Sequence, residues 1–187
     1  MNIILASSSP QRKEILKNAG YDFEVCKSEY DENITGLKYE KELVENCAYQ
    51  KAKDVLLKNN LDNIIISADT VVVANDIILG KPKDKNDAFK TLKLLSNKTH
   101  FVATSICILS RDKKILATDV TYVTFRKLAD EEIKAYIDKQ NPLDKAGSYG
   151  IQDEGFDFCI KIKGQLDTVI GFPLKLFEEK LEEFNKE

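Results

Sequence analysis

The chain has 187 residues, of which 43% are hydrophobic, and it carries a net charge of −3 with an isoelectric point near 5.4. This length allows one substantial core or two small lobes that share one, and the acidic balance argues against a nucleic-acid or membrane-surface protein, whose affinity rests on excess Lys and Arg. Its apolar runs are far shorter than the ~20 residues that cross a bilayer and no signal-peptide pattern follows Met1-Asn2, so we expect a cytoplasmic protein with no membrane and no nucleic-acid partner.

The first predicted unit is a strand over residues 3–6 that passes through a serine-rich turn into a helix. Ser9 is the expected N-cap and Pro10 the first helical residue. Arg12 and Lys13 then lie in the first turn, where the helix dipole disfavours each cation by about 0.3–1 kcal/mol. Either both side chains point into water, or an anion lies between them and the helix start and compensates for the penalty.

A lysine inside an apolar stripe marks the second predicted helix. A short strand near residues 21–25 and a polar loop with Asp31-Glu32 precede this helix, which covers residues 40–58 because their apolar side chains recur at helical spacing. Lys51 falls within that apolar stripe. A lysine at such a position either extends its amine to the edge of the core or reaches into a cleft to meet an anion.

An aspartate is predicted inside a sheet in the next segment. Two β-rich runs, residues 64–66 and 71–73, flank Ser-Ala-Asp-Thr, which places Asp69 in or at the sheet. A buried lone carboxylate costs several kcal/mol unless it is paired, hydrogen-bonded or bound to a metal. Asn75-Asp76 has the composition of a two-residue hairpin turn, after which the chain returns to Lys81.

The remaining segments mix helices with antiparallel strands. They are a helix capped by Asp84, two long strands within residues 101–126, a helix over residues 131–139, a glycine-containing loop "DKAGSYGIQDEG", a hairpin over residues 158–170 and a terminal helix from Leu174. Because we find no linker and no repeat, we expect a single domain over residues 1–187. The alternation of strand-helix units with hairpins predicts an α/β fold with a mixed sheet and helices on its faces.

The cysteines and the single histidine limit the chemistry. No C-x-x-C pair occurs, and each cysteine lies in an apolar stretch, which favours reduced core thiols over disulfides or zinc ligands. With His100 the only histidine, a histidine-based metal site is nearly excluded. The four cysteines are Cys26, Cys47, Cys107 and Cys159.

Each of these features, taken alone, has an ordinary structural explanation. Together they supply the parts for hydrolysing a phosphate anhydride: an anion-binding helix start, several lysines and carboxylates suited to Mg²⁺.

The sequence closely resembles the Maf family of nucleoside triphosphate pyrophosphatases, whose motifs occur here in the family's order over nearly the whole chain. These are "LASSSPQR", "DE" at Asp31-Glu32, "QKAKD", "SADTVV", "GKPKD", "DKAGSYGIQ" and "VIGFP".

The resemblance implies an elongated, twisted mixed sheet of the inosine-triphosphate-pyrophosphatase type, with two lobes, a cleft between them and commonly a homodimer. It also implies hydrolysis of the bond between the α and β phosphates of a nucleoside triphosphate, which yields the monophosphate and pyrophosphate. The family's general base falls on Asp69, and Glu32 with Asp69 would hold a divalent cation, Mg²⁺ or Mn²⁺. The family's phosphate-binding residues fall on Ser7, Arg12, Lys51 and Lys81.

Base selection is assigned by the same resemblance. The glycine loop and Thr70 are similar to the branch of the family that takes dTTP and UTP rather than 7-methyl-GTP, and the base-selecting positions are Gln11, Thr70 and Gln152. Gln11 departs from that branch, which usually has arginine there, so we expect catalysis to survive with an altered base preference. "VIGFP" departs from the usual "VxGLP", and we expect only packing consequences.

Two other functions compete with hydrolysis of dTTP and UTP, including modified pyrimidine nucleotides. The first is a nucleotide-binding regulator of cell division and septum formation with incidental hydrolysis, suggested by the family's historical link with septum formation. A pure binder would not need Asp69, so the retained carboxylates and lysines favour the enzyme. The second is a nucleic-acid-binding protein that uses the helix start as a phosphate clamp, which the acidic isoelectric point disfavours.

Overall fold

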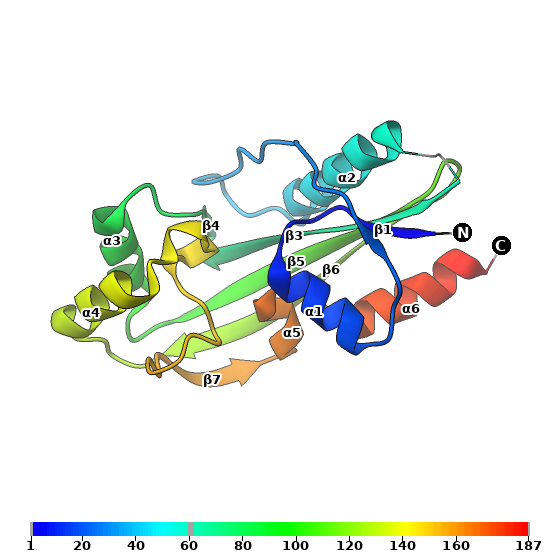
Figure 1. Ribbon diagram of the computed structural model, residues 1–187. Helices are drawn as coiled ribbons and strands as arrows, with labels where there is room; N and C mark the ends of the chain where they lie inside the picture. The colour runs from blue at the N-terminus through cyan, green and yellow to red at the C-terminus, as the bar shows by residue number, and fades with distance from the viewer. Residues whose placement is uncertain (1, 60–61, 187) are drawn as a thin grey trace.

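A computed structural model describes residues 2–59 and 62–186, and the four remaining positions of the predicted 1–187 domain lie outside the described residues. One twisted, elongated sheet runs through the molecule (Figure 1). The strand order is β2-β1-β3-β5-β6-β7, with β4 paired to β3; β1 runs parallel to both of its neighbours and the other pairs are antiparallel. The strands are β1 (Ile3–Leu5), β2 (Glu24–Val25), β3 (Ile64–Ala74), β4 (Ile77–Leu79), β5 (Thr99–Leu109), β6 (Lys114–Phe125) and β7 (Cys159–Lys163).

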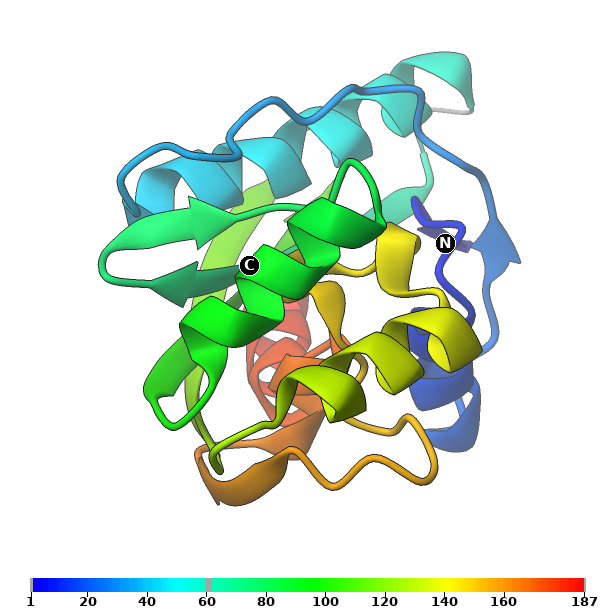
Figure 2. The same cartoon turned by 90° about the vertical axis from the view of Figure 1, so that its left-hand side faces the viewer.

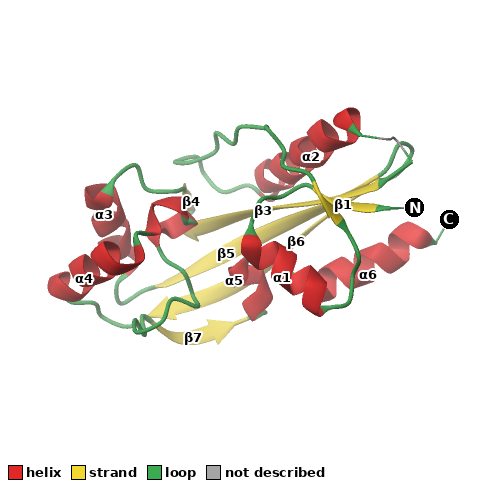
Figure 3. Ribbon diagram, viewed as in Figure 1, coloured by secondary structure: helices red, strands yellow, loops and turns green. Residues whose placement is uncertain are grey.

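Helices cover both faces of this sheet (Figure 3). The long helix α2 packs on one face, α1, α5 and α6 lie on the other, and α3 and α4 pack together at one end of the strands (Figure 2). The helices are α1 (Pro10–Asn18), α2 (Lys41–Lys58), α3 (Lys85–Leu95), α4 (Asp130–Gln140), α5 (Leu166–Ile170) and α6 (Leu174–Asn185), with 3-10 turns η1 (Pro142–Asp144) and η2 (Ala146–Ser148). The predicted mixed α/β fold is confirmed.

The core opposite α2 is divided between the two ends of the sheet. Near β1, Ile66 packs in one cluster with Leu16 of α1 and Phe177 of α6. Farther along the same strand, Val72 packs in another cluster with side chains of α3 and α4, among them Leu92. These residues of β3 share a face because side chains two apart along a strand point the same way.

The outer edge of β3 is interrupted between its two strand partners. β1 pairs with Ile64–Ile66 and β4 with Val72–Ala74, whereas β5 pairs continuously along the opposite edge. Within the described part of the chain, residues 67–71 therefore have no strand on their outer edge, and we call this segment the edge gap. The two predicted runs around Asp69 are one continuous strand, and Asp69 lies in the middle of the edge gap.

Local capping follows the sequence predictions. The Ser9 hydroxyl accepts a hydrogen bond from the Arg12 amide at 3.4 Å, so α1 begins at Pro10 as expected. Asp84 caps α3 in the same way, and the hairpin turn predicted at Asn75-Asp76 has positive φ at both residues, 52° and 62°.

The second arm of the predicted hairpin over residues 158–170 is wrong, because Leu166–Ile170 forms the short helix α5. The Thr121 hydroxyl accepts from the Gln165 amide at 2.8 Å and donates to the Gln165 carbonyl at 2.9 Å. A side chain of β6 thus satisfies the backbone at the start of α5, where a hairpin would have used strand pairing. The apolar residues Leu166, Val169 and Ile170 have the i, i+3, i+4 spacing of a helix, which the hairpin prediction overlooked.

Two further sequence predictions need correction. The strand expected near residues 21–25 is only Glu24–Val25, because its partner β1 offers only three residues. All four cysteines are free thiols, but only Cys47 and Cys107 are buried in the core, whereas Cys26 and Cys159 are half-buried. None of the helices within the described residues has the length and hydropathy that spanning a bilayer requires.

Substitution of Gly164 tests the docking of α5. Gly164 has φ +133°, and an added Cβ would lie 2.9 Å from the Cα of Thr121. Gly20 is a matched control, since it has φ +83° with open space around its Cβ position. Both alanine variants incur backbone strain, and we expect Gly164→Ala to lower the free energy of unfolding by about 1–3 kcal/mol more than Gly20→Ala does. Equal losses in urea denaturation would contradict this.

Candidate active site

Lys51 and Asp69 meet on the face of the sheet that α2 covers. Lys51 is buried, and its Nζ lies 2.6 Å from Asp69 Oδ1 and 2.5 Å from Glu32 Oε1. α2 supplies the lysine, the edge gap of β3 supplies the aspartate, and the loop between β2 and α2 supplies the glutamate. The lysine in the apolar stripe therefore reaches two carboxylates instead of extending into solvent, which settles the alternatives left open by the sequence.

Asp69 is the most deeply buried member of this carboxylate–lysine cluster (Glu32, Lys51 and Asp69), with 1% of its surface exposed. Burial raises its pKa to about 6; Lys51 acts to lower that pKa and the nearby Glu32 carboxylate to raise it. Its second oxygen, Oδ2, is buried and has no hydrogen-bond partner among the described residues. An unpartnered carboxylate oxygen is costly to bury, which is typical of a functional position.

Glu32 links the cluster to solvent. Its side chain is 36% exposed. Partial burial acts to raise its pKa, but the positive charges of Lys51 and Lys81 hold that pKa below the ordinary value. Lys81 is exposed just beyond β4, so its charge acts on the open side of the cluster. The cluster thus pairs a buried carboxylate of raised pKa with a more exposed one that stays ionised.

Arg12 is held by three acceptors from separate parts of the chain. Its Nε donates to the Gly171 carbonyl at 2.8 Å, its Nη2 to Thr70 Oγ1 at 3.0 Å and its Nη1 to Ser7 Oγ at 3.4 Å. Burial lowers the pKa of Arg12, while the charges of Asp69 and Glu32 act to raise it. At the start of α1, one prediction was that the Arg12 side chain only points into water. The structure excludes it, because Arg12 binds three protein acceptors.

No hydrogen bond among the described residues joins the three predicted specificity residues to one another. Thr70 contacts Arg12, whereas Gln11 is exposed and its Oε1 accepts from the Ser9 hydroxyl at 3.0 Å. Gln152 is exposed, and no hydrogen bond within the described residues joins it to Gln11 or Thr70. The base-selecting roles of the three residues stay predictions.

Sequence reasoning missed the acceptor that Gly171 provides. Its motif, "VIGFP", was expected to have packing consequences only, and Phe172 is indeed fully buried against Phe177 with ring centroids 5.1 Å apart. The Gly171 carbonyl, however, binds Arg12 from a position 159 residues along the chain. No side-chain pattern reports a backbone acceptor, so only the position of the motif could have drawn attention to it.

Glu32 and Asp69 fit a weakly held divalent cation better than a closed metal site. The buried, unpartnered Asp69 Oδ2 is an oxygen of the type that Mg²⁺ and Mn²⁺ prefer. No group of three or more His, Cys, Asp or Glu side chains suited to a metal occurs among the described residues. Mg²⁺ commonly binds through one or two carboxylates together with the phosphates of a substrate, and the pair suits that mode.

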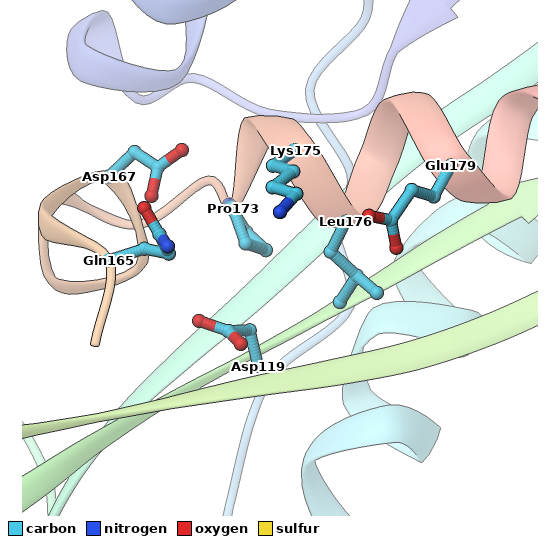
Figure 4. Close-up of a pocket in the computed structure, with 7 residues that line it drawn as sticks. All are labelled: Asp119, Gln165, Asp167, Pro173, Lys175, Leu176 and Glu179. Atoms are coloured by element: carbon cyan, nitrogen blue, oxygen red, sulfur yellow. The ribbon is translucent and has the colours of Figure 1, made fainter.

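A separate pocket lies between β6, α5 and α6. It has a volume of about 210 Å³. Figure 4 shows Asp119 of β6 on one side and side chains from α5 and α6 on the other. None of the sequence-predicted site residues lines this pocket; its lining residues are Asp119, Gln165, Asp167, Pro173, Lys175, Leu176 and Glu179.

The chain matches a known protein family over nearly its whole length. A family model described as Maf-like protein matches residues 2–184. The chain belongs to the Maf family. Curated relatives named dTTP/UTP pyrophosphatase include that of Bacillus anthracis, 45% identical over 183 residues, covering 98% of this chain and 95% of the relative. That of Acholeplasma laidlawii is 46% identical over 188 residues, covering 98% of this chain and 96% of the relative.

The solved structure of the Staphylococcus aureus Ham1 protein shares the fold of this Maf chain. The two superpose with a TM-score of 0.55 at 14% identity, over 99% of this chain and 100% of the other. At that identity the likeness concerns the fold alone. It confirms the fold type expected from the resemblance.

Proposed function

We propose that this Maf protein is a pyrophosphatase that hydrolyses the α–β phosphate bond of dTTP and UTP to the monophosphate and pyrophosphate. The observation that carries the proposal is the buried contact of Lys51 with Asp69, placed in the edge gap close enough for the Asp69 charge to act on Arg12. The names of the curated relatives support the substrates. A cytoplasmic location and a homodimer stay predictions.

Asp69 is the proposed general base. The Asp69 carboxylate accepts a proton from the attacking water, through a lone pair that a bound cation would leave free, as that water adds to the phosphate anhydride and pyrophosphate departs. A carboxylate with a pKa of about 6 is mostly ionised at neutral pH, yet more basic than an ordinary aspartate. The mechanism therefore uses the burial that raises this pKa.

The cations of the site offset charge on the substrate and on the leaving pyrophosphate. Two of the three N–H donors of Lys51 bind Asp69 and Glu32, and the third is available for a phosphate oxygen. Arg12, Lys81 and Ser7 complete the proposed phosphate-binding set. Mg²⁺ or Mn²⁺, when bound by Glu32 and Asp69, would neutralise charge on the triphosphate.

The pH dependence of kcat/KM follows from Asp69. Because the base must be ionised, and its pKa is raised to about 6, kcat/KM for dTTP should rise with pH and level off above about pH 7. The Glu32→Gln variant removes the carboxylate that acts to raise this pKa, so its acidic limb should shift to lower pH. The contribution of Asp69 to the free energy of unfolding has the opposite pH dependence. It is greatest below pH 3.8 and falls as the pH rises toward 6. A flat kcat/KM between pH 5 and 8 would contradict the assignment.

The substrate assignment is tested by measuring pyrophosphate and orthophosphate from dTTP, UTP, CTP, GTP, 7-methyl-GTP and ITP with Mg²⁺ or Mn²⁺. We expect pyrophosphate only, with dTTP and UTP preferred. A different preferred base would mean that Gln11 has changed the specificity. No hydrolysis of any triphosphate would overturn the proposed activity and favour the nucleotide-binding regulator instead.

A further inference from the structure

A chain of hydroxyl groups connects Arg12 to the interior of the sheet. Thr70 Oγ1 and Thr104 Oγ1 are 3.0 Å apart on neighbouring strands, and Thr104 Oγ1 lies 2.8 Å from the Thr168 carbonyl of α5. Thr104 and Thr168 are completely buried. No role has yet been given to Thr104 by the motifs or by the site chemistry.

The directions of these hydrogen bonds follow from their partners. A carbonyl only accepts, so Thr104 donates its single hydroxyl proton to Thr168. Thr70 then donates to Thr104, and a lone pair of the Thr70 hydroxyl accepts from Arg12 Nη2. The Gly171 carbonyl is a competing but more distant acceptor for the Thr70 hydroxyl, at 3.5 Å, so the shortest contacts run from Arg12 through Thr70 and Thr104 to the Thr168 carbonyl. Thr104 therefore determines which side of the Thr70 oxygen faces Arg12.

Thr104 also supports the second acceptor of Arg12. Its bond to the Thr168 carbonyl fixes α5 on the sheet, together with the hydroxyl of Thr168, which donates to Asp119 at the edge of the pocket in Figure 4. Gly171 follows the last residue of α5; its amide donates to the Asp167 carbonyl at 2.9 Å, and its own carbonyl accepts from Arg12 Nε. The Thr70 hydroxyl and the Gly171 carbonyl are thus both placed by contacts that include Thr104.

Holding Arg12 in this way leaves part of the guanidinium for a ligand. Five N–H donors less the three bound by Gly171, Thr70 and Ser7 leave two within the described residues, one on each terminal nitrogen. Donors on the two terminal nitrogens suit phosphate oxygens. The orientation of this pair depends on the opposite edge of the guanidinium, where Nε and Nη2 bind the protein.

We propose that Thr104 is a positioning residue for Arg12, which it orients toward the substrate phosphates through Thr70 and through α5. This inference rests on the proposed function, because it assigns Arg12 to the phosphates of the triphosphate. Thr104 itself touches no substrate. Its effect on hydrolysis should therefore pass entirely through Arg12, which distinguishes positioning from a general contribution to the fold.

The test is a double-mutant cycle with Thr104→Val, Arg12→Ala and the double variant, using kcat/KM for dTTP. We expect Thr104→Val to lower kcat/KM by about 10-fold or more, the size that one misplaced charged hydrogen bond gives, and Thr104→Ser to retain most of the activity. In the Arg12→Ala background, Thr104→Val should change kcat/KM by less than about twofold. If Thr104→Val does not fold, Thr104→Ala takes its place in the cycle.

A control comes from the neighbouring pair of strands, β5 and β6. Thr99 and Thr124 also pair their hydroxyls, at 2.8 Å, away from Arg12, so Thr124→Val should leave kcat/KM unchanged. The same double-mutant cycle is repeated with a second measurement, the Kd for inorganic triphosphate in the absence of metal. Equal losses from Thr104→Val in both backgrounds, or no loss in the wild type, would overturn the positioning role while leaving the proposed function intact. A wild-type protein that neither hydrolyses dTTP nor binds triphosphate would overturn both.

Discussion

Replacing Asp69 with asparagine is expected to lower kcat for dTTP by about 10²- to 10⁴-fold, the range that a general base contributes. The amide has the shape of the carboxylate but cannot accept a proton from water. Glu32, the other carboxylate beside Lys51, has a pKa held below its ordinary value and is therefore a weaker base than Asp69. Initial rates of pyrophosphate release measure the effect.

Binding separates the loss of a base from the loss of the site. Lys51 keeps its contact with Glu32, so Asp69→Asn should bind dTTP with a Kd within several-fold of the wild type. Asp138, exposed in an ion pair with Lys85, provides the control, and Asp138→Asn should keep full activity. Retention of kcat in a folded Asp69→Asn protein would show that another group takes the proton.

Replacing Lys51 with methionine is expected to have the largest effect on stability. Methionine keeps the length of the side chain, but it leaves the carboxylate of Asp69 buried without its cation. Removing one partner of a buried ion pair costs about 3–5 kcal/mol, and we expect a loss of this size in the free energy of unfolding at pH 7. The variant should also lose activity, because Lys51 is proposed to bind phosphate.

The pH dependence of that loss identifies its cause. Lys51 acts to lower the pKa of Asp69, so the variant should bind a proton at Asp69 up to higher pH than the wild type. Protonation removes the buried charge, and the stability gap should shrink between pH 7 and pH 5 in urea titrations. Lys85→Met, which breaks an exposed pair, should change stability little. A gap that is independent of pH would point to lost packing.

The spacing of apolar residues correctly predicted the helix that carries Lys51 and the strand that carries Asp69. The helical spacing of residues 40–58 placed Lys51 in an apolar stripe, and the β-rich runs around Asp69 placed a carboxylate in the sheet. Both predictions succeed because side-chain direction in a helix or strand is a local property of the backbone. Capping by Ser9 was predicted for the same reason, since it depends on residues within one turn.

Prediction failed at the segment that forms α5 and at the Gly171 carbonyl that follows it. Leu166–Ile170 was predicted as a strand but forms α5, and hydroxyls on β5 and β6 bind the backbone around it. The carbonyl of Gly171 then becomes an acceptor for Arg12. The apolar spacing of Leu166, Val169 and Ile170 is that of a helix. The position of the Gly171 carbonyl is not encoded in the segment, since it depends on threonines more than 40 residues away in sequence.

The sequence alone determined the family, the elements that carry Lys51 and Asp69, and the kinds of residue available for binding phosphate. The tertiary structure decided that β1 and β4 stop short of each other on the edge of β3, which leaves Asp69 and Thr70 in the edge gap. It also decided the partners of Arg12 and the pairing of Lys51 with two carboxylates. These features depend on distances between segments far apart in the chain, and local propensity carries no information about such distances.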